Sequence, residues 1–107
     1  MKKLLTVFVC ACAGLAHAEF KDGNKLLSEI TDGGYYNQGV AMGYIMGVSD
    51  ASVRITHCPP PNSTAGQMFD AVKMYLNNNP QNRHYSADSI VNHVLGGIWP
   101  CKKGSGV

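Results

Sequence analysis

The chain has 107 residues, of which 45% are hydrophobic and 15% are charged, and its formal net charge is +2. This length allows one small domain and excludes a large enzyme. The mean hydropathy of −0.09 excludes a protein that crosses a membrane several times, and the small net charge excludes a nucleic-acid-binding protein that depends on a strong basic field.

The first 18 residues have the three parts of a secretory signal peptide. They begin with two lysines, continue with the apolar run 4–15 and end with Ala16-His17-Ala18, which matches an A-x-A cleavage site. The apolar run is too short to span a bilayer. We therefore expect export to the periplasm and cleavage between Ala18 and Glu19.

The same stretch offers one alternative, a lipoprotein acylated at Cys12. This alternative is disfavoured because Cys10 stands where a lipobox normally has a small or β-branched residue. The A-x-A site that follows would then be a coincidence.

Export changes both the charge and the cysteine content of the protein. The 89 residues after Ala18 carry seven basic and seven acidic side chains, so the mature chain is formally neutral. It has no electrostatic reason to bind DNA, RNA or anionic lipid. Two cysteines remain, Cys58 and Cys101, and in an exported chain we expect them to form one disulfide. Such a bridge would stabilise the fold by about 4 kcal/mol in the chain-entropy model.

The apolar spacing of the mature chain predicts helices. Strict alternation is absent, while 3.6-residue spacing recurs between clusters of Gly, Pro and Asn. We therefore predict an all-α fold, a compact bundle of about four helices within residues 19–101. The first helix covers about residues 24–30 and ends at Gly33-Gly34. The second covers about residues 37–54 and includes an Asp50–Arg54 pair at helical spacing.

The second predicted helix carries Gly39, Gly43 and Gly47 at intervals of four residues. Each glycine inside a helix costs roughly 0.5–1 kcal/mol relative to alanine, so the series needs a compensating role. We expect this smooth face to pack closely inside the fold. The alternative is close contact with a partner protein.

A proline-rich segment separates the second and third helices. Cys58-Pro59-Pro60-Pro61-Asn62 cannot continue a helix, and we expect it to form a stiff connector. The third helix then begins with a capping box made by Thr64 and Gln67 and ends within Asn77-Asn78-Asn79-Pro80.

The fourth helix is predicted to begin at Ser86, a good N-cap residue, and to end or fray at Gly96-Gly97. We expect Trp99, which follows, to belong to the core. The disulfide would then connect the ends of the second and fourth helices. Residues 102–107 have no apolar anchor and are expected to form a loose tail.

No residue pattern indicates catalysis or a cofactor. His57, His84, His93 and Cys58 lack the C-x2-C or H-x3-H spacing of a zinc site. The serines lack a G-x-S-x-G frame or a comparable one. We therefore expect neither a metal, nor a cofactor, nor an enzymatic activity.

Two adjacent tyrosines, Tyr35 and Tyr36, lie at the glycine-rich start of the second helix. Tyrosine is frequent at the energetic centres of protein interfaces, so the pair could anchor a partner. Covering the core is the other use of such side chains, and we expect at least one of the two to be buried.

Five short motifs follow one another along the mature chain: FKDGNKLL at 20–27, GYIMGVSDA at 43–51, CPP at 58–60, NP at 79–80 and WPC at 99–101. In this order and spacing they resemble the Rap/Tai immunity protein family over about residues 20–101. The resemblance implies a small helical periplasmic protein that binds a type VI secretion effector and blocks its active site. Effectors of this kind include peptidoglycan amidases.

The resemblance also bears on the cysteines. It implies that Cys58 and Cys101 pair. Many relatives carry a second cysteine pair at places that correspond here to Ile30 and Ala41, so it implies one bridge instead of two, with apolar packing in place of the other.

We therefore predict a periplasmic immunity protein whose partner is a cell-wall hydrolase toxin. A homodimer through the glycine face is an alternative use of that surface. Two further hypotheses are a periplasmic stress protein or chaperone, for which the charge density is low, and an orphan binding module without a toxin. The predicted contact residues are Tyr35, Tyr36, Gly39, Gly43, Gly47, Pro60 and Asn62.

Overall fold

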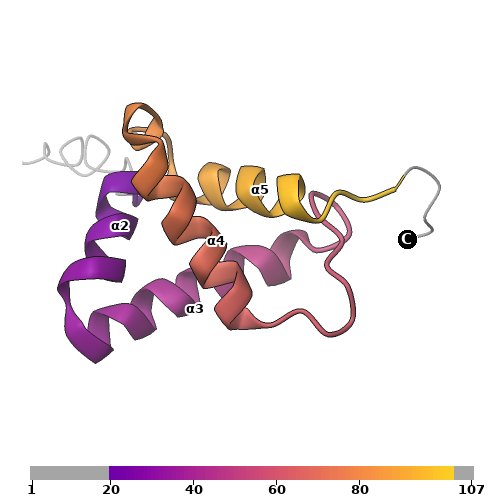
Figure 1. The fold of residues 1–107 in the computed structure, drawn as a ribbon, viewed down its shortest axis with the longest axis horizontal. Coiled ribbons are helices and arrows are strands. Elements are labelled where there is room, and N and C mark those ends of the chain that lie inside the picture. Colours follow the sequence, from indigo (N-terminus) through magenta and orange to yellow (C-terminus); the bar gives the residue numbers. More distant parts are fainter. Residues whose placement is uncertain (1–19, 103–107) are drawn as a thin grey trace, which may run out of the picture.

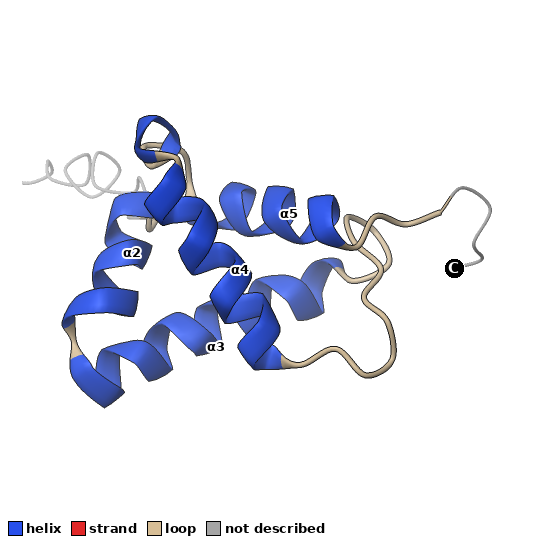
Figure 2. Cartoon of the chain, in the orientation of Figure 1, coloured by secondary structure: helices blue, strands red, loops and turns tan. Residues whose placement is uncertain are grey.

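The computed structural model describes residues 20–102. The predicted signal peptide, its cleavage site at Ala18 and Glu19, and residues 103–107 of the predicted tail lie outside this part. The described chain forms four α-helices and one short 3-10 helix: α2 (Gly23–Asp32), α3 (Gly34–Ser52), α4 (Ala65–Asn78), η1 (Pro80–Asn82) and α5 (Ala87–Ile98). Figure 2 shows helices joined by loops, which confirms the all-α prediction.

The helices are arranged around one core. In Figure 1, α4 crosses in front of α3, and α5 runs beside α3. Helix α4 contacts each of the other three helices, and α5 also contacts α3. The core is formed by apolar side chains from all four helices: Leu26, Ile30, Ala41, Ile45, Met68, Val72, Leu76, Ala87, Ile90, Val91, Val94 and Leu95.

The core identifies which side of α3 faces inward. The apolar residues of α3 fall on two neighbouring strips, one through Val40 and Tyr44 and the other through Ala41 and Ile45. The structure buries the second strip completely and the first only in part. Ile30 and Ala41, where the resemblance implied apolar packing in place of a second cysteine pair, are both buried in the core.

Local signals at the helix ends are largely as predicted. The Thr64 hydroxyl accepts a hydrogen bond from the Gln67 backbone N–H at 3.1 Å, and the Gln67 side chain accepts one from the Thr64 N–H at 2.8 Å. The predicted capping box is therefore confirmed. Ser86 is the N-cap residue of α5, but its hydroxyl contacts the Ser89 hydroxyl at 2.8 Å and caps no backbone group.

Two predictions about helix ends are wrong. Helix α5 does not end or fray at Gly96-Gly97 but continues to Ile98, and Gly96, which has no side chain, lies directly against the Thr56 carbonyl. Helix α3 ends at Ser52, before Arg54, whose φ of 69° is incompatible with a helix. The predicted Asp50–Arg54 ion pair, which would lie wholly within the described residues, therefore does not form.

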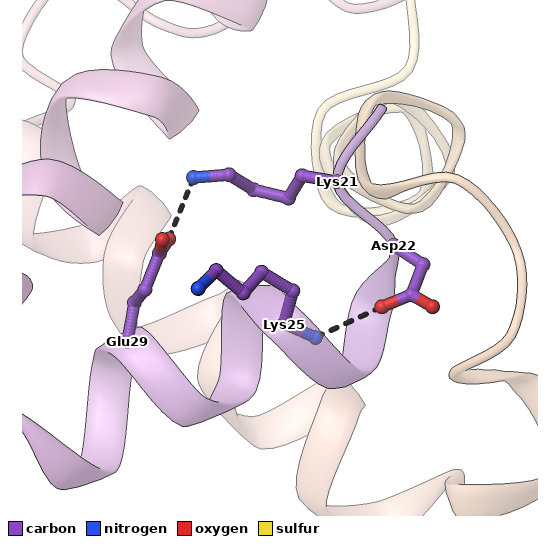
Figure 3. A network of polar contacts seen from close by, with 4 residues as sticks. All are labelled: Lys21, Asp22, Lys25 and Glu29. Carbon is purple, nitrogen blue, oxygen red and sulfur yellow. Dashed lines mark hydrogen bonds and ion pairs between the residues drawn. The ribbon is translucent and has the colours of Figure 1, made fainter. Parts of the chain in front are cut away.

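The beginning of the described chain is fixed against the connection between α4 and α5. The Gly23 N–H donates to the Tyr85 carbonyl at 3.1 Å, and the Ala87 N–H donates to the Lys21 carbonyl at 2.9 Å. Figure 3 shows the Lys21 side chain reaching Glu29, with 2.6 Å between Nζ and Oε1. The Asp22 carboxylate caps α2 in the same view. Together these bonds hold the first residues of the fold in place.

Candidate protein-binding surface

Three glycines lie on the outer side of α3. Gly39, Gly43 and Gly47 are exposed, and a Cβ atom added to any of them would meet no atom within 4 Å. The expectation that this face packs inside the fold is therefore wrong. The reason is geometric, since Ala41 and Ile45 direct the opposite side of the same helix into the core.

The two tyrosines continue this outer surface. Tyr35 is 94% exposed and Tyr36 is 80% exposed, so the expectation that at least one is buried is also wrong. Helix α3 begins immediately after the break at Gly33, which places both side chains in its first turn and away from the core. Gly34 enables the abrupt change of direction between α2 and α3, because its φ of 66° favours glycine.

We call Tyr36, Gly39, Gly43 and Gly47 the glycine strip. Their spacing of three, four and four residues places them on one helix face. At 1.5 Å per residue the strip is about 17 Å long. The strip contains no charged side chain, and Asp50 is the one charged residue of α3, one turn beyond Gly47. A partner would therefore meet a smooth and uncharged surface with an aromatic ring at one end.

The other two predicted contact residues lie elsewhere. Pro60 and Asn62 are exposed in the loop that joins α3 to α4. Figure 1 shows this loop at the end of the molecule opposite the α2–α3 corner. Since α3 has 19 residues, about 28 Å separates its two ends. The structure thus divides the predicted contact residues into the glycine strip with Tyr35 and a separate loop group.

The loop after α3 exposes two residues, Arg54 and Ile55, that were not among the predicted contact residues. Ile55 is 77% exposed, and Arg54 beside it has the positive φ that is uncommon outside glycine. The Arg54 N–H donates to the His57 carbonyl at 2.7 Å, which closes the turn. The apolar spacing predicted a helix that continued through Arg54, and no local sequence signal indicated this turn.

His57 is the last residue of this turn, and its side chain lies in a buried polar cluster. Its ring is 0% exposed, with Nε2 at 2.8 Å from the Ser49 hydroxyl and Nδ1 at 2.9 Å from the Thr56 hydroxyl. The hydroxyls of Thr56 and Ser52 both donate to Asn92 Oδ1 on α5, at 3.0 and 2.8 Å. Burial lowers the pKa of His57 below its ordinary value of 6.5.

The Ser49–His57 contact has the length of a nucleophile–base pair, but its surroundings do not suit catalysis. Ser49 is 3% exposed and His57 is fully buried, so a substrate could not reach either group. Every buried side-chain N or O atom in residues 20–102 has a hydrogen-bond partner. Over the same residues, no three His, Cys, Asp or Glu side chains converge as metal ligands would. The cluster instead joins α3, the following loop and α5.

The predicted disulfide is present beside this cluster. Cys58 and Cys101 are bonded, with their Cα atoms 4.8 Å apart. The Cys58 N–H also donates to the Trp99 carbonyl at 2.8 Å. Trp99 is partly buried and packs against the core. The bridge therefore fixes the loop after α3 to the end of α5, as predicted.

A second surface feature is a shallow groove between α4 and α5. It has a volume of about 470 Å³ and is lined mainly by apolar groups, including Met74, Val94 and Ile98. Gly97 lines the same groove, and a Cβ atom there would meet no atom within 4 Å. Gly97 is therefore a helical glycine in open space that lies outside the glycine strip.

Residues 20–102 form a small helical fold that is held by the Cys58–Cys101 disulfide and has an exposed, glycine-rich helix face. The family profile of the Rap1a immunity proteins matches residues 22–101. The chain therefore belongs to the Rap1a immunity protein family, in agreement with the resemblance found in the sequence. No curated protein matches the chain significantly. No helix within residues 20–102 is long and apolar enough to cross a membrane.

Proposed function

We propose that this protein is a periplasmic immunity protein that binds a type VI secretion effector, a peptidoglycan amidase, and blocks its active site. The observation that carries this proposal is the family match, which covers almost the whole described chain. The exposed glycine strip supports it, because it offers a rigid surface that the fold itself does not use. Protection then results from binding and needs no chemistry by the immunity protein.

An immunity protein must bind tightly enough to act on a small number of toxin molecules. Nanomolar affinity corresponds to about −12 kcal/mol. A surface that is already ordered loses little entropy on binding, which favours such an affinity. The disulfide and the buried side of α3 supply this order. The glycines then allow a partner backbone to approach closely, and Tyr35 and Tyr36 serve as aromatic anchors beside them.

Co-expression tests the proposed activity directly. Reading frames beside the gene are searched for a small hydrolase with a catalytic Cys–His pair, and the candidate is exported to the periplasm with or without this protein. We expect lysis without the protein and survival with it. Equal lysis in both cultures would contradict the proposal for that pair.

Matched substitutions test the proposed contact surface. We expect Gly43→Gln to weaken toxin binding at least tenfold, because a long side chain prevents close approach to the strip. Gly97→Gln adds the same side chain to an equally open helical glycine outside the strip, and we expect binding within twofold of the wild type. If only Gly97→Gln weakens binding, the contact surface is the groove between α4 and α5.

The glycine strip could also be used by a second copy of this chain. Sedimentation of the wild type and of Gly43→Gln separates this use from toxin binding. A wild-type dimer that Gly43→Gln converts to a monomer assigns the strip to self-association. If the wild type and Gly43→Gln are both monomers, the strip is not used for self-association and remains available to the toxin.

A further inference from the structure

His57 is the one titratable side chain among residues 20–102 that is completely buried, and it is the last residue of the exposed loop 53–57. It contacts Ser49 of α3 at 2.8 Å and Thr56 of the loop at 2.9 Å. Thr56 in turn reaches Asn92 of α5. We call these four residues the His57 latch, because their bonds hold the loop 53–57 against both helices.

The hydrogen bonds of the latch suit a neutral ring. Thr56 donates to Asn92 Oδ1, so its oxygen is free to accept a bond from the His57 Nδ1–H. The other ring nitrogen, Nε2, then accepts from the Ser49 hydroxyl. A second proton on the ring would turn Nε2 into a donor, so the Ser49 oxygen would have to accept that bond and the Ser49 hydroxyl proton would need another acceptor.

Among residues 20–102 no carboxylate forms an ion pair with His57, so a protonated ring would be buried without a paired charge. The ionisable groups closest in sequence to the latch residues are Asp50 on α3, Arg54 in the loop and His93 on α5, and all three are exposed. Cys58 is bonded in the disulfide and does not titrate. Burial is the cause that acts on His57, and a buried charge without a partner is strongly unfavourable.

We propose that the His57 latch is an acid-sensitive switch. When the ring gains a proton, the loop 53–57 with its exposed Arg54 and Ile55 detaches from α3 and α5. The disulfide keeps Cys58 beside Cys101, so the opening is confined to the loop. The opening does not depend on the proposed function.

The direction of the pH effect follows from the lowered pKa of His57. The opened loop exposes the ring and restores its ordinary pKa of about 6.5, while burial keeps the value in the closed state lower. Above pH 6.5 the ring is neutral in both states, so protonation does not favour the open loop. As the pH drops from about 6.5 toward the pKa of the closed state, the equilibrium constant for opening rises by up to tenfold per pH unit.

Nuclear magnetic resonance of the wild-type protein between pH 8 and pH 4.5 tests the switch. We expect the His57 ring signal to titrate below pH 6.5 and the amide signals of residues 53–57 to change with the same midpoint, while core amides such as that of Ile45 stay constant. A His57 midpoint at or above 6.5 would overturn the proposal. So would loop signals that stay unchanged while His57 titrates.

Two variants connect the response to this one ring. His57→Gln cannot gain a proton, and we expect its loop signals to be independent of pH over the same range. His93→Gln removes an exposed histidine from α5 and should keep the wild-type response. A pH response that persists in His57→Gln would contradict the assignment, and the wild-type titration decides the matter alone if that variant does not fold.

Discussion

The two sides of α3 are built on different principles. On the inner side, Ala41 and Ile45 are completely buried and fix the position of the helix. On the outer side, Gly39, Gly43 and Gly47 contact nothing and lower the intrinsic helix stability by roughly 0.5–1 kcal/mol each. The inner side therefore accounts for the fold. The glycines of the outer side therefore destabilise the isolated fold, and we expect them to serve contact with a partner.

The largest effect we predict concerns the bridge that fixes the end of α3 to α5. Cys58→Ala should lower the free energy of unfolding by about 4 kcal/mol, because the open chain regains the entropy of a 43-residue loop. Urea titration under oxidising conditions measures this loss. Cys101→Ala and the double variant should give the same value, since all three remove one bond. A loss below about 1 kcal/mol would show that the bridge contributes little to holding α3 in place.

The next effect compares one residue from each side of α3. Ile45→Ala should lower the free energy of unfolding by about 3 kcal/mol, because it removes buried methyl groups and leaves a cavity. Tyr36→Ala removes a larger side chain from the outer side and should change stability by less than about 0.5 kcal/mol. Urea titration of both variants at one pH gives the comparison. Similar losses would mean that Tyr36 supports the fold, contrary to its exposure.

The two sides of α3 also show how far the sequence predicts the structure. The fold class, the capping box of Thr64 and Gln67 and the disulfide were predictable because each depends on local pattern or on few residues. The buried side of α3 was not, because its apolar residues are spread around the helix. A periodic pattern cannot then decide which strip meets the core.

The same limit applies to the ends of α3 and α5. The turn at Arg54 depends on a bond to the His57 carbonyl, and the continuation of α5 through Gly96 accompanies its contact with Thr56. The first is a bond within one turn that the apolar spacing does not reveal, and the second is a tertiary contact that no short segment encodes. On the surface, the sequence identified Tyr35, Tyr36 and the glycines as unusual residues, but only the fold shows that they are exposed.

The smallest effect concerns the outer side of α3. Glycine to alanine should stabilise the protein at an open position on α3 and destabilise it at a packed position on α5. Gly43→Ala should raise the free energy of unfolding by about 0.5–1 kcal/mol, since the new methyl group meets open space and alanine favours the helix. For a domain of this size the gain corresponds to a rise in Tm of about 2–8 °C. Thermal unfolding followed by circular dichroism measures it.

Gly96→Ala is the matched control for this gain. Its Cβ atom would lie 2.9 Å from the Thr56 carbonyl oxygen, a backbone atom that cannot move aside freely, so we expect a loss of about 1–3 kcal/mol. If Gly43→Ala also destabilised the protein, the strip would already be packed in solution, and a second copy of the chain would be the first surface to examine. A gain in stability together with weaker toxin binding would instead mean that the glycines are retained for the partner at the expense of the helix.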